Sequence, residues 1–157
     1  MMAKGEENFD VILKGLPQEK VDGWKSEIKQ DENGEDVFEA YGKISDNEIH
    51  DYKHDADQWT LNYMKVTHLP VSDTKVQALM KEAYLMMNSM LYKTIDNFKG
   101  ANYEFLKGTN EGGRKDKVVV DIYETYQKGM AKHYFDAMDY FAETTLKDNE
   151  DYYVKLT

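Results

Sequence analysis

The apolar positions of the chain repeat most regularly in its middle. Between Asp73 and Phe98 they recur at alternating spacings of three and four residues, which is the pattern of an amphipathic helix. The seam consists of Val76, Met80, Ala83, Met87, Met90 and Thr94, and it is widened by Leu79, Tyr84, Met86, Leu91, Ile95 and Phe98. Because so wide an apolar face is unstable in water, we expect other helices, or a second copy of the chain, to cover it.

Two more segments have the same helical repeat. Ser45 and Glu48 form a capping box, which predicts a helix that ends near His68, shortly before Pro70. Its apolar face is Ile49, Tyr52, Ala56, Trp59, Tyr63 and Val66. A second capping box at Asp121–Glu124 begins a third long helix, whose apolar face is Tyr123, Tyr126, Met130, Tyr134, Ala137, Met138, Phe141 and Thr145.

The N-terminal segment has shorter and mixed signals. The alternation of Phe9, Val11 and Leu13 predicts a short strand, and the Leu16–Pro17 pair predicts a brief helix behind it. The Asn33–Gly34 pair favours a tight β-hairpin, because both central residues of such a turn need positive φ. The returning strand would contain Val37, Phe38 and Tyr41.

The helical repeat is lost between residues 100 and 117, where Gly108, Gly112 and Gly113, with Asn110, predict an exposed loop or a loose hairpin. The run Val118–Val120 that follows fits either a strand stub or the start of the third helix. Gly129 lies inside that helix, where glycine costs about 1 kcal/mol relative to alanine, and it therefore indicates a close packing contact.

These elements predict a mainly α fold: three long amphipathic helices with a small acidic N-terminal α+β portion that contains the hairpin. A chain of 157 residues is long enough to bury one core, so we expect a single domain over residues 1–157. Residues 1–44 would form the N-terminal portion, residues 45–147 the helical core and residues 148–157 an acidic tail.

The composition limits the chemistry that the side chains can perform and the cellular compartment in which we expect the protein. The chain contains no cysteine, which excludes disulfides, thiolate metal sites and cysteine nucleophiles. No apolar run approaches the roughly 20 residues that span a bilayer, and residues 1–10 lack the features of a signal peptide. We therefore expect a cytoplasmic protein without a membrane partner, or a virion-associated protein if the chain is encoded by a phage.

The net charge of −10 is concentrated in the first half of the chain. From Lys29 to Asp57 the chain has 10 acidic residues and only 3 lysines. Such a patch repels nucleic acid and anionic membranes and attracts a basic partner. We call it the acidic patch and predict that it binds a protein; its members are Asp31, Glu32, Glu35, Asp36, Glu39, Asp46, Glu48, Asp51, Asp55 and Asp57.

A divalent metal is a second hypothesis for the same region. His50 and His54 are four residues apart on the second predicted helix, with Asp57 close behind, and this spacing suits a metal ion. A solvated acidic face explains these residues more simply. The acidic run around Gly34 lacks the ligand spacing of a calcium-binding EF-hand loop. We therefore assign neither a metal nor a cofactor.

Two motifs elsewhere indicate possible catalytic chemistry. The segment Gly108 to Lys115 has the glycine spacing of a phosphate-binding loop, but Arg114 stands where that loop needs lysine. His133 and Asp136 have the spacing of a base and its orienting carboxylate. No serine lies in a Gly-x-Ser-x-Gly turn, so the histidine has no evident nucleophile. We assign no catalytic residue and expect a protein that is not an enzyme.

Two functions fit these observations. The first is a non-enzymatic protein–protein interaction or assembly protein that self-associates, or joins a larger particle, through helix faces rich in Tyr and Met. The 12 tyrosines and 9 methionines favour it. The second is an acidic mimic of nucleic acid that inhibits a DNA- or RNA-binding enzyme, as phage-encoded inhibitors do, and the acidic patch favours it. Both predict a protein partner and no direct contact with nucleic acid.

Overall fold

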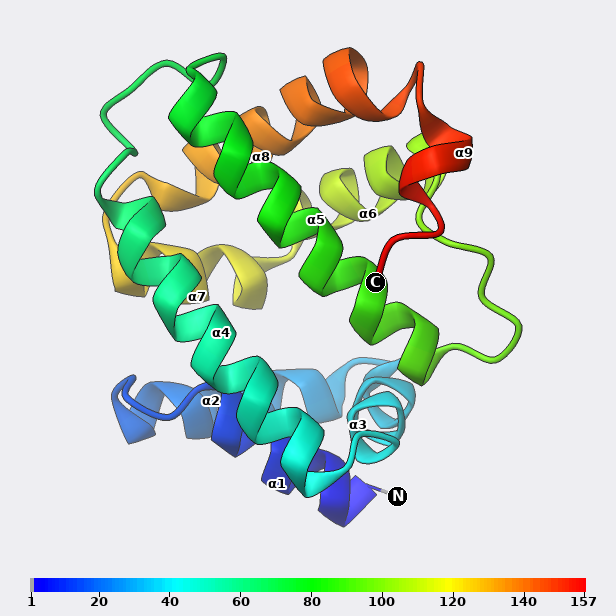
Figure 1. Cartoon of the computed structure of the whole chain (residues 1–157). Coiled ribbons are helices and arrows are strands. Elements are labelled where there is room, and N and C mark those ends of the chain that lie inside the picture. Colours follow the sequence, from blue (N-terminus) through cyan, green and yellow to red (C-terminus); the bar gives the residue numbers. More distant parts are fainter. Residues whose placement is uncertain (1) are drawn as a thin grey trace. The chain divides into compact units, whose positions relative to one another are not determined.

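The computed structural model describes residues 2–157, so Met1, the first residue of the predicted domain, lies outside the described residues. The fold is mainly α, as predicted (Figure 1). Between residues 2 and 157 no strand forms, and Lys14 and Leu16 make an isolated bridge. The helices are α1 (Met2–Ile12), α2 (Gln18–Gln30), α3 (Gly34–Gly42), α4 (Asp46–Met64), α5 (Thr74–Thr94), α6 (Tyr103–Lys115), α7 (Lys117–Tyr126), α8 (Met130–Phe141), the π-helical segment Ala142–Leu146 and α9 (Glu150–Tyr153).

The described chain divides into two compact units. The first unit comprises the residues up to Asp57 together with Lys93–Asp96, and the second comprises Gln58–Tyr92 and Asn97–Thr157. The chain passes from one unit to the other inside α4, near the end of α5, and again after Asp96. That the chain folds as one domain stays a prediction. None of the helices described here has the length and the apolar content that crossing a membrane would require.

Helix α1 occupies the segment in which alternating residues predicted a strand, so that prediction is wrong. Phe9 and Leu13 are both buried, and the Leu13 N–H donates to the Phe9 carbonyl oxygen at 3.1 Å, as in a helical turn. Residues four apart share a face in a helix and also in a strand. An alternation of only five residues therefore does not distinguish the two periods.

The predicted hairpin is also wrong, because its returning strand belongs to α3. Asn33 has a φ of −100°, and Gly34 is not among the glycines with positive φ, so the pair does not form the expected turn. Gly34 has a packing role instead. A Cβ atom at this position would lie 1.9 Å from the carbonyl oxygen of Ile28 in α2.

Helices α1 and α3 pack against each other through a second glycine. A Cβ atom at Gly5 would lie 1.7 Å from the carbonyl oxygen of Phe38, so only glycine permits this approach. The ring of Phe9 meets that of Phe38 edge-on, with 5.7 Å between the centroids. The buried amide of Asn8 donates to the Tyr41 carbonyl oxygen at 2.7 Å, which satisfies a polar group inside the packed helices.

The capping box predicted at Ser45 and Glu48 is confirmed. The Ser45 N–H donates to Glu48 Oε1 at 3.1 Å, and the Glu48 N–H donates to Ser45 Oγ at 3.2 Å, which is a complete capping box. The bonds from Ser45, followed by that from Lys93, lower the pKa of the Glu48 carboxyl. Asp73 stands before α5, and its Oδ1 accepts from the Lys75 N–H at 2.9 Å.

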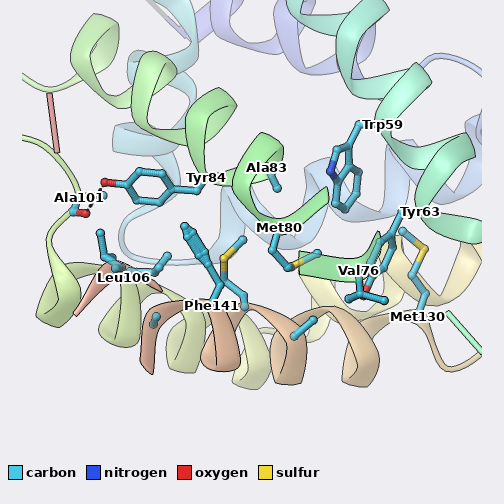
Figure 2. Packing of buried hydrophobic residues seen from close by; sticks show 14 residues of the cluster. Trp59, Tyr63, Val76, Met80, Ala83, Tyr84, Ala101, Leu106, Met130 and Phe141 are labelled. Atoms are coloured by element: carbon cyan, nitrogen blue, oxygen red, sulfur yellow. Dashed lines mark hydrogen bonds between the residues drawn. The ribbon is translucent and has the colours of Figure 1, made fainter. Parts of the chain in front are cut away.

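Helix α5 carries the core of the second unit (Figure 2). Val76, Met80 and Tyr84 on its apolar face are 0% exposed. They pack in one buried cluster with Leu106 from α6 and Phe141 from α8. Residues of α6 and α8, which belong to the same unit, therefore cover the buried part of the apolar face of α5.

The glycine-rich segment predicted to be a loop is helix α6, so that prediction is wrong. Asn102 caps it, since its side-chain oxygen accepts from the Phe105 N–H at 2.9 Å. A Cβ atom at Gly108 or Gly112 would contact nothing within 4 Å, so these glycines leave the helix geometrically unstrained. The cap and the buried Leu106 stabilise a helix that composition alone disfavours.

The third long helix is interrupted, which corrects another prediction. Asp116 rather than Asp121 caps α7, so Val118–Val120 are helical. Gly129 has a φ of +86° between α7 and α8, and a Cβ atom there would contact nothing within 4 Å. Glycine is therefore needed for the backbone break and not for packing. Glu124 accepts from the N–H groups of Gly129 and Ala131, so it caps the following helix.

Candidate functional site

The acidic patch lies entirely in the first unit. Its ten carboxylates come from the turn before α3, from α3 itself, and from the part of α4 that ends at Asp57. Eight of the ten residues are exposed, whereas Glu48 and Asp57 are half-buried. The backbone thus presents most of this charge to solvent.

Lysines of the first unit neutralise three members of the patch. Two of these partners are 42 and 45 residues away in the sequence, so only the fold reveals their pairing, whereas the third is an i,i+4 pair within α4. The pairs are Lys4–Asp46, Lys53–Asp57 at 2.9 Å and Lys93–Glu48 at 3.1 Å.

One of these lysines has further partners, and another lysine of the unit pairs outside the patch. Lys53 Nζ also donates to the carbonyl oxygens of Ile12 and Lys14, at 2.8 and 2.7 Å, and so binds the free carbonyls at the end of α1. Lys25 pairs with Asp10 at 3.0 Å, outside the patch. The hydrogen bond to Asp10 raises the pKa of Lys25, against a smaller opposing effect of burial.

Seven members of the patch have no ion pair within residues 2–157, and we call them the unpaired carboxylates. Glu35 and Glu39 are four residues apart on α3, and Asp51 and Asp55 are four apart on α4, so each couple shares one helix face. All seven are exposed. They are Asp31, Glu32, Glu35, Asp36, Glu39, Asp51 and Asp55.

The charge of the chain is almost wholly in the first unit. This unit contains 17 acidic residues and 8 lysines, a net of −9, and the second contains 13 acidic and 12 basic residues, a net of −1. Lys4, Lys25, Lys29, Lys53 and Lys93 form ion pairs inside this unit, so its net negative charge remains on other carboxylates, the seven unpaired carboxylates of the patch among them. Such a surface attracts cationic groups.

The histidines proposed as metal ligands lie on α4, where both His50 and His54 are exposed. Asp57, the third candidate, binds the ammonium group of Lys53. Among the described residues, no three His, Asp or Glu side chains are grouped as a metal ion would require.

His133 has different partners from the one suggested by its spacing. One ring nitrogen, Nε2, lies 2.8 Å from the Leu69 carbonyl oxygen, which can only accept a hydrogen bond, so Nε2 carries the proton. Nδ1 of the neutral ring then accepts from the hydroxyl of Tyr63. Tyr63 is fully buried, and burial, with smaller contributions from Tyr134 and Asp136, raises its pKa. The pair joins a buried tyrosine to a half-buried histidine.

Asp136 belongs instead to an ion-pair network that links α6 to α8. Arg114 Nη1 lies 2.9 Å from Asp136 and Nη2 lies 2.6 Å from Asp139. Burial raises the pKa of Asp136, but the hydrogen bonds from Lys132 and Arg114 outweigh it and lower the pKa. Because α6 is helical and Arg114 is engaged by carboxylates, this segment does not have the geometry of a phosphate-binding loop.

The helix faces rich in Tyr and Met are partly buried, and residues such as Met87, Met90 and Tyr126 on them are half-buried. Met80, Tyr84, Met130 and Met138 are at most 2% exposed. The exposed large apolar residues of the described chain come from four different helices and from the segment after α5, and they are Val37, Leu61, Ile95, Tyr140 and Tyr152.

Comparison with known proteins gives no relative. The chain matches no protein-family model, no curated protein and no solved structure.

Proposed function

We propose that this chain is a non-enzymatic protein–protein interaction protein that binds a basic partner through the unpaired carboxylates of its first unit. The observation that carries the proposal is the division of charge: five of the eight lysines of the unit form ion pairs inside it, while seven exposed carboxylates of the patch form none among the described residues. An isolated exposed ion pair contributes only about 0.2–1 kcal/mol, so binding needs several at once.

The acidic mimic of nucleic acid is the more specific form of this proposal. A basic groove that binds phosphates would also accept carboxylates held on rigid helices, such as Glu35 and Glu39 on α3. In this form the partner is a DNA- or RNA-binding enzyme, and the protein and the nucleic acid exclude each other. Self-association through the Tyr- and Met-rich faces has less support, because the packing of the second unit already buries much of those faces.

The test compares two variants with the same net charge. The first neutralises four unpaired carboxylates by the substitutions Glu35→Gln, Glu39→Gln, Asp51→Asn and Asp55→Asn. The control neutralises four exposed carboxylates of the second unit by the substitutions Glu82→Gln, Glu104→Gln, Asp148→Asn and Asp151→Asn. Each protein is immobilised and used to capture partners from the cell that encodes the chain.

A specific partner should bind the wild type and the control but not the first variant, and rising salt should release it. Release by added double-stranded DNA would support the nucleic-acid mimic. Equal capture by the two variants would contradict the proposal, because the effect would then follow total charge and not the patch.

A further inference from the structure

The first unit has a much smaller buried core than the second. The buried cluster around α5 consists only of residues of the second unit, among them Trp59 and Tyr63 (Figure 2). Among the described residues, seven buried apolar side chains belong to the first unit and sixteen to the second. A unit of 61 residues removes only about 60% of its unfolded surface from water, so its folded form is marginally stable.

The same small unit carries nearly all of the net charge. Its net charge is −9 over 61 residues, whereas the second unit has −1 over 96 residues. Its carboxylates repel one another more strongly when the unit is folded, because the radius of gyration is about 10 Å for a folded chain of this length and about 24 Å for an unfolded one. Net charge therefore destabilises the first unit and has little effect on the second.

We propose that the first unit opens and closes independently of the second, and that neutralisation of its charge, by salt or by a cationic partner, closes it. At about 0.01 M salt the screening length is about 30 Å, so carboxylates repel one another across the whole folded unit. At about 0.15 M it is about 8 Å, and only near neighbours repel. A partner that binds only the closed form stabilises that form. The effect of the partner rests on the proposed function, whereas the effect of salt does not.

Helix α4 contains the point at which the opening should stop. Its residues Asp46–Asp57 belong to the first unit and Gln58–Met64 to the second. In the second part, Trp59 stacks on Tyr63 with 4.9 Å between ring centroids, and its Nε1–H donates to the Leu79 carbonyl oxygen of α5 at 2.8 Å. The first part is held instead by the end of α1, through the bonds of its lysine. We therefore expect α4 to open in its first part and to stay helical in its second.

Amide hydrogen exchange, followed by NMR on the unmodified chain, measures the opening residue by residue. Raising sodium chloride from about 0.01 to about 0.15 M should slow the exchange of protected amides in the first unit about 10–50-fold, and should change that in α5 and α8 by less than about 3-fold. The change should end inside α4, between Ile49 and Tyr63. Unchanged exchange in the first unit, or equal slowing in both units, would overturn the proposal.

Two matched variants separate the charge of the first unit from the total charge. Neutralising Glu35, Glu39, Asp51 and Asp55 changes the charge of the unit from −9 to −5, and the repulsion, which grows with the square of the charge, falls to about a third. At about 0.01 M salt this variant should reach the protection that the wild type has at about 0.15 M. The control variant, neutralised at four carboxylates of the second unit, should exchange like the wild type. Equal protection of the two variants would contradict the proposal.

A decalysine peptide, added at about 0.01 M salt, tests the effect of a cationic partner. It should slow exchange in the first unit and leave the second unit unchanged. Binding without any slowing would contradict the proposal, because the peptide would then not favour the closed form. Absence of binding would contradict the proposed function alone, since the response to salt independently shows whether charge controls the opening.

Discussion

The same glycine-to-alanine substitution should have opposite effects at two positions of the first unit. Gly5 lies inside α1, where an added Cβ atom would be 1.7 Å from the Phe38 carbonyl oxygen of α3. Gly23 lies inside α2, exposed, with nothing within 4 Å of the added atom. Each alanine gains about 1 kcal/mol of helix propensity. The two substitutions therefore differ in one respect, because only Gly5→Ala adds an atom where α1 contacts α3.

The magnitude follows from the distance. Real Cβ contacts are almost never shorter than 3.0 Å, so α1 and α3 would have to move apart by about 1.3 Å. Overpacking costs about 1–3 kcal/mol, and the upper value applies because a backbone carbonyl cannot rotate away as a side chain can. We therefore expect Gly5→Ala to lose about 2 kcal/mol net and Gly23→Ala to gain up to about 1 kcal/mol.

Urea unfolding measures both changes. A difference of about 3 kcal/mol separates the two midpoints by about 1.5 M for a slope of about 2 kcal/mol/M. Fluorescence reports both units, since Trp24 is buried in the first and Trp59 in the second. The reasoning would be refuted if Gly5→Ala were as stable as Gly23→Ala, because α1 and α3 would then not be in contact at Gly5.

Two further substitutions test the second unit. Hydrogen bonds from the N–H groups of Gly129 and Ala131 lower the pKa of Glu124, so its stabilising effect is present at neutral pH and is lost as the pH falls below about 4.3, the ordinary value for glutamic acid. Glu124→Gln should lose about 1 kcal/mol at pH 7 and approach the wild type in acid; a constant deficit would contradict this. His133→Phe should lose about 1–3 kcal/mol by leaving the Tyr63 hydroxyl unpaired, and adding Tyr63→Phe should restore part of it. A double-mutant cycle with no coupling would rule out the bond.

The elements that sequence predicted correctly are those with local signals. Helices α4 and α5 have caps within three residues of their first turn and long apolar faces, so neighbouring residues decide them. The errors arise where contacts distant in sequence decide the backbone. Gly34 favours a turn locally, but its approach to Ile28 selects a helix. The repeat of the third helix continues in phase across Gly129, which conceals the break.

The sequence predicts which acidic residues form the acidic patch, but it does not predict which of them are neutralised by lysines in the folded protein. Exposure of acidic residues follows from composition, because such side chains are rarely buried unpaired. Which members are neutralised depends on the fold: Glu48 meets Lys93 and Asp46 meets Lys4 from distant segments.

The central claim is that localised carboxylates of the first unit, and not total charge, bind a basic partner. The most direct measurement is the dissociation constant for a decalysine peptide at about 0.15 M salt, where the screening length is about 8 Å. Four lost ion pairs at about 0.3–0.7 kcal/mol each should weaken binding about 10–100-fold in the variant at Glu35, Glu39, Asp51 and Asp55. The variant with four neutralised carboxylates in the second unit should bind within about 3-fold of the wild type, since those charges lie outside the patch. Equal weakening in both variants would contradict the claim.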